Sequence, residues 1–119
     1  MHIKGVSIMR DEFLNEFLKK VKKIVAKEGP CLAKDRNGNY RGKNYNFLRD
    51  NGLTLDHAKE AILQLSSKDK IAGPEADRDG YPGYIYKFKS KYLTDEVIYI
   101  KIRFSPPDEV ICISFHDDE

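Results

Sequence analysis

Residues 97–116 read VIYIKIRFSPPDEVICISFH, and this stretch decides the fold. Before the turn SPPDE at residues 105–109, every second position is apolar: Ile98, Ile100, Ile102 and Phe104. After the turn the alternation resumes with Ile111, Ile113 and Phe115. A period of two is typical of strands that bury one face, and a short turn pairs them antiparallel. We therefore expect the other face to be polar and to carry Tyr99, Lys101, Arg103, Cys112, Ser114 and His116.

A third strand and a long helix complete the outline. Residues 84–89, YIYKFK, place Tyr84, Tyr86 and Phe88 opposite Ile85, Lys87 and Lys89. Residues 11–28 carry apolar side chains at spacings of three and four, and Gly29-Pro30 ends the pattern, which predicts an amphipathic helix. Its apolar stripe needs a partner, and the Ile-rich sheet face supplies one. The fold class predicted is α+β, an antiparallel twisted sheet with helices packed on one face.

The middle of the chain is less regular. Residues 34–43 hold four cations and one acid around the turn sequence NGN, which predicts a basic loop or hairpin. A short helix is expected over residues 44–50, ending near Gly52. Thr54 is placed to cap the next helix, whose buried stripe is expected to be Leu55, Ala58, Ile62 and Leu65. Residues 73–83 are rich in Gly and Pro and predict a surface loop.

Composition limits the class of protein. The 119 residues suit one domain, residues 1–119, and the net charge of +2 does not by itself indicate a nucleic-acid binder. The sequence has no long apolar run and no pattern of a signal peptide, so no membrane association is expected. Cys31 and Cys112 are the two cysteines, and we expect reduced thiols in a cytoplasmic protein.

The predicted polar sheet face is the candidate site. On three neighbouring strands it would gather cations, a phenol and an imidazole: Lys87, Lys89, Tyr99, Lys101, Arg103 and His116. Cations bind phosphates, an aromatic ring can stack on a base, and histidine titrates near neutral pH. That set suffices for RNA cleavage without a metal. The alternative is an ordinary solvated face, since Lys, Arg and Tyr are common there.

Metal chemistry is not indicated by the spacing of the ligand residues. Cys112 and His116 with His2 or His57 lack the close pairs of a zinc site. The acidic loop at residues 75–79 begins like a calcium loop but lacks its later bidentate Glu. The sequence therefore predicts no metal and no cofactor.

Several segments, taken in order, resemble a known family. Residues 46–54, NFLRDNGLT, and 62–69, ILQLSSKD, are similar to the helical part of MqsR-type toxins of the RelE-like superfamily. Residues 97–102, VIYIKI, and 110–116, VICISFH, resemble the two closing strands of that family. The segment 73–83 followed by IYKF at 85–88 is similar to one family branch. The resemblance covers about residues 44–116.

The resemblance implies a RelE-like fold and an mRNA interferase, the toxin of a type II toxin–antitoxin system. Such a toxin is an endoribonuclease that cleaves mRNA without a metal and is neutralised by a cognate antitoxin protein, with the ribosome as a further candidate partner. It implies catalytic roles for Tyr99, His116 and Lys87. The chemistry of the predicted polar face adds Lys89, Lys101 and Arg103 as RNA-binding cations. His116 stands where the family more often has Lys, and Lys87 where it has Gln. A further family Lys has no clear match, since Lys70 is offset and Ala72 occupies the position.

Two other functions remain open on the sequence. A non-catalytic RelE-fold relative would act by protein–protein binding, with Tyr99 and His116 as interface residues. An uncharacterised globular domain would carry neither activity.

Overall fold

The computed structural model describes residues 2–118, and their side chains from residue 11 onward. In chain order the elements are α1 (His2–Glu28), α2 (Gly42–Asp50), α3 (Leu55–Leu63), a short 3-10 helix η1 (Ser67–Asp69), β1 (Lys70–Glu75), β2 (Tyr84–Ser90), β3 (Ile98–Ser105) and β4 (Glu109–His116). The four strands form one antiparallel sheet in the order β1-β2-β3-β4. This confirms the α+β class.

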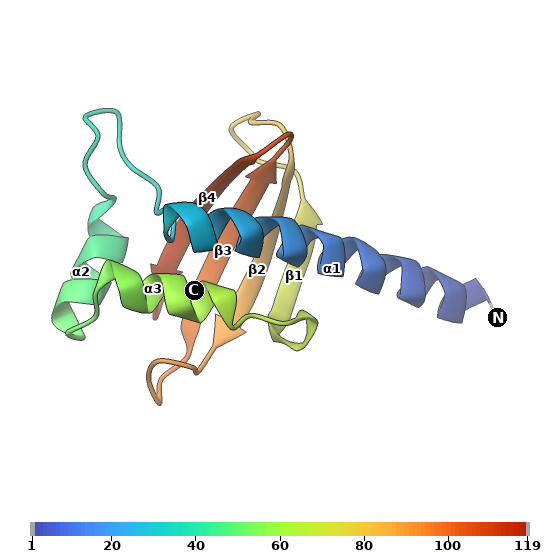
Figure 1. Cartoon of the computed structure of the whole chain (residues 1–119), viewed down its shortest axis with the longest axis horizontal. Helices are drawn as coiled ribbons and strands as arrows, with labels where there is room; N and C mark the ends of the chain where they lie inside the picture. The colour runs from blue at the N-terminus through green and yellow to red at the C-terminus, as the bar shows by residue number, and fades with distance from the viewer. Residues whose placement is uncertain (1, 119) are drawn as a thin grey trace.

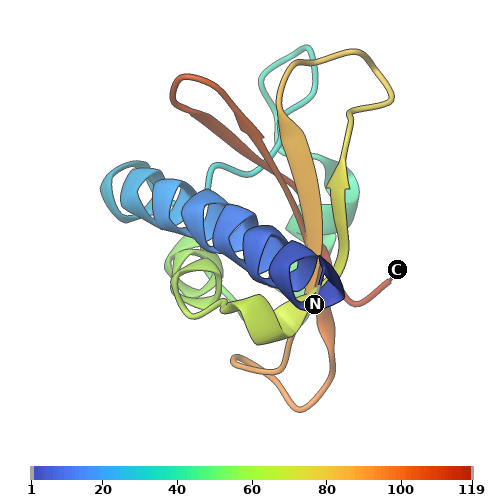
Figure 2. The same cartoon turned by 90° about the vertical axis from the view of Figure 1, so that its right-hand side faces the viewer.

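Helices α1 and α3 lie together against one face of the sheet (Figures 1 and 2). Along α1 the buried side chains recur at helical spacing and pack on the inward side chains of β2 and β3, with the ring centres of Phe17 and Tyr86 4.6 Å apart. Fully burying one large apolar side chain contributes about 1.5–3 kcal/mol. Because the helices cover one face of the sheet, the opposite face is the one left toward solvent. No helix among the residues described is long and apolar enough to cross a membrane.

The predicted helices are present, with differences in their bounds and in one side chain. The first begins at His2 rather than near residue 11. The helix α3 is capped as predicted, because the Thr54 side chain accepts the His57 backbone N–H and the His57 ring accepts that of Thr54. Leu55, predicted to be buried in α3, is 39% exposed, because it lies in the first turn outside the contact with the core.

The prediction of a surface loop over residues 73–83 was wrong for the first part of that segment. Residues up to Glu75 form the end of β1, which pairs with β2 at Glu75 and Ile85. Pro74 fits here because β1 is an edge strand, where a missing N–H need not break the sheet. The loop between the strands is thus residues 76–83, here called the β1–β2 loop.

A bulge in β4 changes which side chains face the core. On β3, Lys101 pairs with Ser114 and the next residue, Ile102, pairs with Cys112, so Ile113 is the extra residue. The alternation reverses at that point. Cys112 and Val110 are therefore buried in the core, whereas Ile111 and Ile113 lie half-buried on the polar face. The prediction for Ile111, Ile113 and Cys112 was wrong; that for Ser114, Phe115 and His116 was right.

The outer edge of β4 is covered by chain from the N-terminal half. The Cys112 N–H donates to the Cys31 carbonyl at 2.8 Å, and the Ala33 N–H donates to the Cys112 carbonyl at 2.9 Å. Further along this edge the side chain of Asn44, in α2, bonds to the β4 backbone. Its amide donates to the Ile113 carbonyl at 3.1 Å and accepts the Phe115 N–H at 2.9 Å. These bonds pair an edge that would otherwise be open, and they hold the bulge.

Candidate functional site

The three strands β2, β3 and β4 are neighbours, and their registers place the predicted residues on one face. Tyr99 pairs directly with His116 on one side and with Lys89 on the other. Lys101 pairs with Lys87 and Ser114. Side chains at paired positions lie about 4.5–5.5 Å apart at Cβ. The face predicted from alternation is therefore present, and it is divided into two parts with different chemistry.

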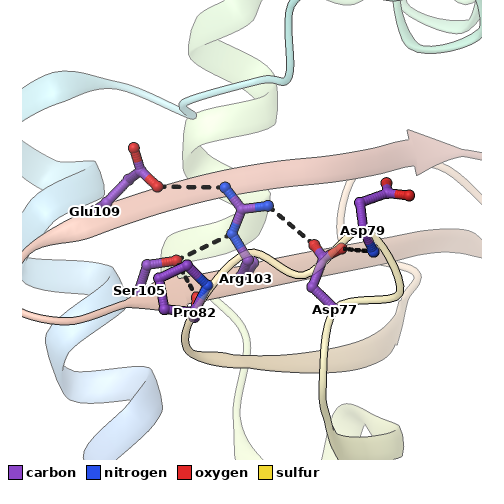
Figure 3. Close-up of polar contacts among 6 residues, drawn as sticks. All are labelled: Asp77, Asp79, Pro82, Arg103, Ser105 and Glu109. Carbon is purple, nitrogen blue, oxygen red and sulfur yellow. Dashed lines mark hydrogen bonds and ion pairs between the residues drawn. The ribbon is translucent and has the colours of Figure 1, made fainter.

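One part is closed by the β1–β2 loop and contains Arg103. Its side chain is buried, and its guanidinium donates to Ser105 Oγ at 3.1 Å, Asp77 Oδ2 at 3.0 Å and Glu109 Oε1 at 3.3 Å (Figure 3). The exposed ring of Tyr81 stacks on it, with 4.4 Å from Cζ to the ring centre. The sequence predicted a free cation for RNA. Instead, two carboxylates already neutralise Arg103, and it has little access to a phosphate.

The contacts around Arg103 fasten the β1–β2 loop to the sheet. Asp77, whose side chain is only 8% exposed, also accepts the Asp79 N–H at 2.7 Å. This hydrogen bond, together with Arg103, holds the pKa of Asp77 below its ordinary value. Ser105 Oγ donates to the Pro82 carbonyl at 2.6 Å (Figure 3). Gly83 has φ +105°, and a Cβ there would overlap the Phe104 carbonyl oxygen, so the loop returns to the sheet at a position that requires glycine.

The other part of the face is an open cavity of about 250 Å³ around Tyr99 and His116. It is lined from the sheet by Lys87, Lys101 and Ser114, and from the β1–β2 loop by Arg78. Here a phenol, an imidazole and three cations border the same space. Four of the six predicted site residues therefore meet at one cavity.

His116 is the histidine that lines this cavity. Its side chain is 8% exposed, and burial, followed by the nearby Lys43 ammonium, lowers its pKa below the ordinary value against the opposing Asp118 carboxylate. The Asp118 N–H donates to Nδ1 at 3.3 Å. Lys43 also pairs with Asp118 at 2.8 Å, which holds the tail beside the ring. The ring is thus neutral at pH 7, and its second nitrogen, Nε2, has no hydrogen bond to residues 11–118.

The lysines of the face differ in how free they are. Lys87 lies 3.8 Å from a Glu75 oxygen, and Lys89 is exposed with its ammonium 6.0 Å from the centre of the Tyr99 ring. No carboxylate of residues 11–118 lies within ion-pairing distance of Lys101. Among these three lysines, Lys101 is the one that lines the cavity of Tyr99 and His116 without a carboxylate partner among residues 11–118.

Sequence reasoning missed Arg78 and Ser114 as lining residues. Arg78 sits in a loop whose path the sequence could not give, so nothing pointed to its place beside Lys101. Ser114 was placed on the correct face without a role. As for metal ions, no three His, Cys, Asp or Glu side chains among those described cluster to hold one.

No family model, no curated protein and no solved structure matches the chain. A functional proposal for this chain therefore rests on the geometry of its site and on the resemblance of its sequence segments.

Proposed function

We propose that this chain is a RelE-like endoribonuclease of the MqsR type, the toxin of a type II toxin–antitoxin system that cleaves mRNA without a metal. The observation that carries the proposal is the pairing of Tyr99 with His116 across β3 and β4, at a cavity bordered by Lys87, Lys101 and Arg78. Imidazole and phenol can carry the two proton transfers of RNA transesterification, and ammonium groups can stabilise the charged phosphorane. The family resemblance supplies the reaction class.

In the proposed reaction the 2′-hydroxyl of RNA attacks the adjacent phosphorus. A base takes the 2′ proton, the bond from phosphorus to the 5′-oxygen breaks, and an acid gives that oxygen a proton. His116 is neutral at pH 7, because its pKa is lowered by burial, and a neutral imidazole is suited to the base. Tyr99 then serves as the acid, and proton exchange between the paired side chains restores both groups.

Use of His116 as the base has a structural requirement. With Nδ1 accepting the Asp118 N–H, the neutral ring carries its proton on Nε2. The base form requires a lone pair toward the substrate. The ring must therefore leave the Asp118 contact or change tautomer when RNA binds. At 3.3 Å this hydrogen bond is long, and Asp118 is exposed, so the contact is weak enough to give way.

The charged groups have separate tasks in this proposal. Lys101, with no carboxylate of residues 11–118 in reach, and Lys87 bind the scissile phosphate and stabilise charge on the phosphorane. Lys89 lies beside Tyr99 and binds a neighbouring phosphate. Arg103 does not contact RNA but holds the β1–β2 loop.

The test is cleavage of a long single-stranded RNA in EDTA by purified protein. We expect His116→Gln to lower the rate by about 10²–10⁴-fold, the usual contribution of a general base. His57→Gln is the matched control, because it removes a histidine far from the face and glutamine can still complete the cap of α3. Equal rates for wild type and His116→Gln would refute the proposal.

A further inference from the structure

A second, larger groove continues from the Tyr99–His116 cavity along the polar face. It has a volume of about 480 Å³, within the range of pockets that hold small organic ligands. Both spaces are lined by Arg78, Lys87 and Lys101, so they meet along these residues. The far wall comes from the hairpin of residues 32–41, where Lys34 bridges to Tyr40. We call this space the hairpin groove.

The walls of the hairpin groove come from two segments far apart in the sequence. The hairpin and the β1–β2 loop project from the same end of the sheet (Figures 1 and 2). Lys34 and Arg41 belong to the hairpin, and Arg78 belongs to the β1–β2 loop. All three are exposed. The basic segment that the sequence left without a role thus borders the candidate site.

Positive charge is in excess in the hairpin groove. Six cationic and three carboxylate side chains line it. Two of the carboxylates are engaged, Asp77 with Arg103 and Glu75 with Lys87. No carboxylate of residues 11–118 is within 4.0 Å of the charged nitrogens of Lys34, Arg41, Arg78 or Lys101. A polyanion would therefore meet cations that need not first break an ion pair.

The floor of the hairpin groove is partly apolar, and the β4 bulge contributes to this. The bulge turns Ile111 and Ile113 to this face, where both line the hairpin groove. The ring of Tyr81 lies at the rim, stacked on Arg103. Apolar and aromatic surface beside cations suits single-stranded nucleic acid, whose bases stack while its phosphates bind the cations. A duplex, with its bases turned inward, would leave this floor unused.

We propose that the hairpin groove binds the single-stranded RNA that continues from the scissile phosphate, with Lys34, Arg41 and Arg78 on its phosphates and Ile111, Ile113 and Tyr81 against its bases. This inference rests on the proposed function and extends it, because it assigns a substrate path to a segment outside the resemblance. The hairpin groove contributes affinity for long RNA, and the chemistry stays in the Tyr99–His116 cavity.

The test measures RNA binding separately from cleavage. The hairpin variant Lys34→Ala/Arg41→Ala and the control Lys19→Ala/Lys23→Ala are compared with the otherwise unchanged chain, all three in a His116→Gln background. The control removes the same charge as the first from exposed positions on α1. Fluorescence anisotropy reports the binding of a labelled single-stranded RNA of about ten nucleotides, in the range of single-strand site sizes. A labelled trinucleotide is measured in parallel.

We expect the hairpin variant to bind the long RNA several-fold more weakly, with the trinucleotide unaffected. Each lost phosphate contact reduces the slope of log K against log salt concentration by about 0.7 in magnitude. The slope of the double variant should therefore be smaller by about 1.4. The α1 control should keep the wild-type slope. Equal losses in the hairpin and α1 variants would overturn the inference. So would binding of poly-glutamate in preference to RNA, which would make the hairpin groove a site for acidic peptide.

Cleavage by the wild-type protein separates this inference from the proposed function. If wild type cleaves RNA and the hairpin variant binds it normally, the endoribonuclease stands and the hairpin groove fails. If wild type does not cleave RNA and the hairpin variant still loses affinity and salt slope, the hairpin groove stands and the endoribonuclease fails.

Discussion

Asn44 is the residue through which the N-terminal half of the chain determines the position of His116. Its side chain is 2% exposed and makes two hydrogen bonds to the edge of β4, on either side of Ser114. The change that isolates them is Asn44→Leu, which keeps a similar shape but can neither donate nor accept. Phe115 would be left with a buried N–H, and Ile113 with a carbonyl that is only partly buried.

The expected cost comes from those two orphaned groups. A buried backbone group without a partner costs about 1–3 kcal/mol. The Phe115 N–H should bear the full penalty, because the bond is buried, and the Ile113 carbonyl a smaller one, because water can reach it. We expect a loss of about 2–4 kcal/mol in the free energy of unfolding, a large fraction of the 5–15 kcal/mol typical of a domain.

Urea unfolding followed by circular dichroism measures the loss, with Asn46→Leu as the control. Asn46 is exposed on the same helix, so this change should stay within about 0.5 kcal/mol. Amide exchange at Phe115 should accelerate in Asn44→Leu, and RNA cleavage should fall, because His116 is the next residue. If both leucine variants unfold at the same urea concentration, or if the Phe115 amide stays protected in Asn44→Leu, Asn44 does not hold the bulge.

Three further predictions concern pH, thiol chemistry and the β1–β2 loop. Burial lowers the pKa of His116, so as pH falls through about 6.5 the unfolded chain binds a proton before the folded chain does. The free energy of unfolding should therefore decline there, and should decline less in His116→Gln. Identical curves of unfolding free energy against pH for the two proteins would contradict this. Burial raises the pKa of Cys112 far above its ordinary value and raises that of Cys31 less. A thiol reagent should therefore modify Cys31 first and Cys112 only on unfolding. Equal rates of modification would show that Cys112 is accessible. Arg103→Met should release Asp77 and speed trypsin cleavage within the β1–β2 loop several-fold, and an unchanged rate would mean that the loop is held without Arg103.

Much of the fold could be predicted from periodicity alone. The alternation in β2 and β3 placed Tyr99, Lys101 and Lys87 on the polar face, and the structure agrees because these strands pair without interruption. In β4 the same reasoning put Ile111 on the wrong face. A bulge reverses the alternation in β4, and nothing in the sequence ICIS of residues 111–114 marks its position. The bulge is held by hydrogen bonds to Asn44, some seventy residues earlier in the chain.

The environment of each site residue was harder to predict than its face. Arg103 looked like a free cation, but its partners are a residue of the β1–β2 loop and one across the β3–β4 turn. Arg78 was not considered at all, since its place depends on how that loop folds back onto the sheet. Alternation gives the side of a strand on which a residue lies. It does not give what lies above it, because the path of a loop is set by contacts distant in sequence.

The chemistry of the RNA ends tests the central claim most directly. A long RNA is incubated in EDTA with wild type and, in parallel, with identically purified His116→Gln, and the fragments are analysed by mass spectrometry. Attack by the 2′-hydroxyl at a site built on Tyr99 and His116 predicts 2′,3′-cyclic phosphate and 5′-hydroxyl ends from wild type and none above background from His116→Gln. Fragments with 3′-hydroxyl and 5′-phosphate ends, or the same cyclic ends from both proteins, would contradict the account.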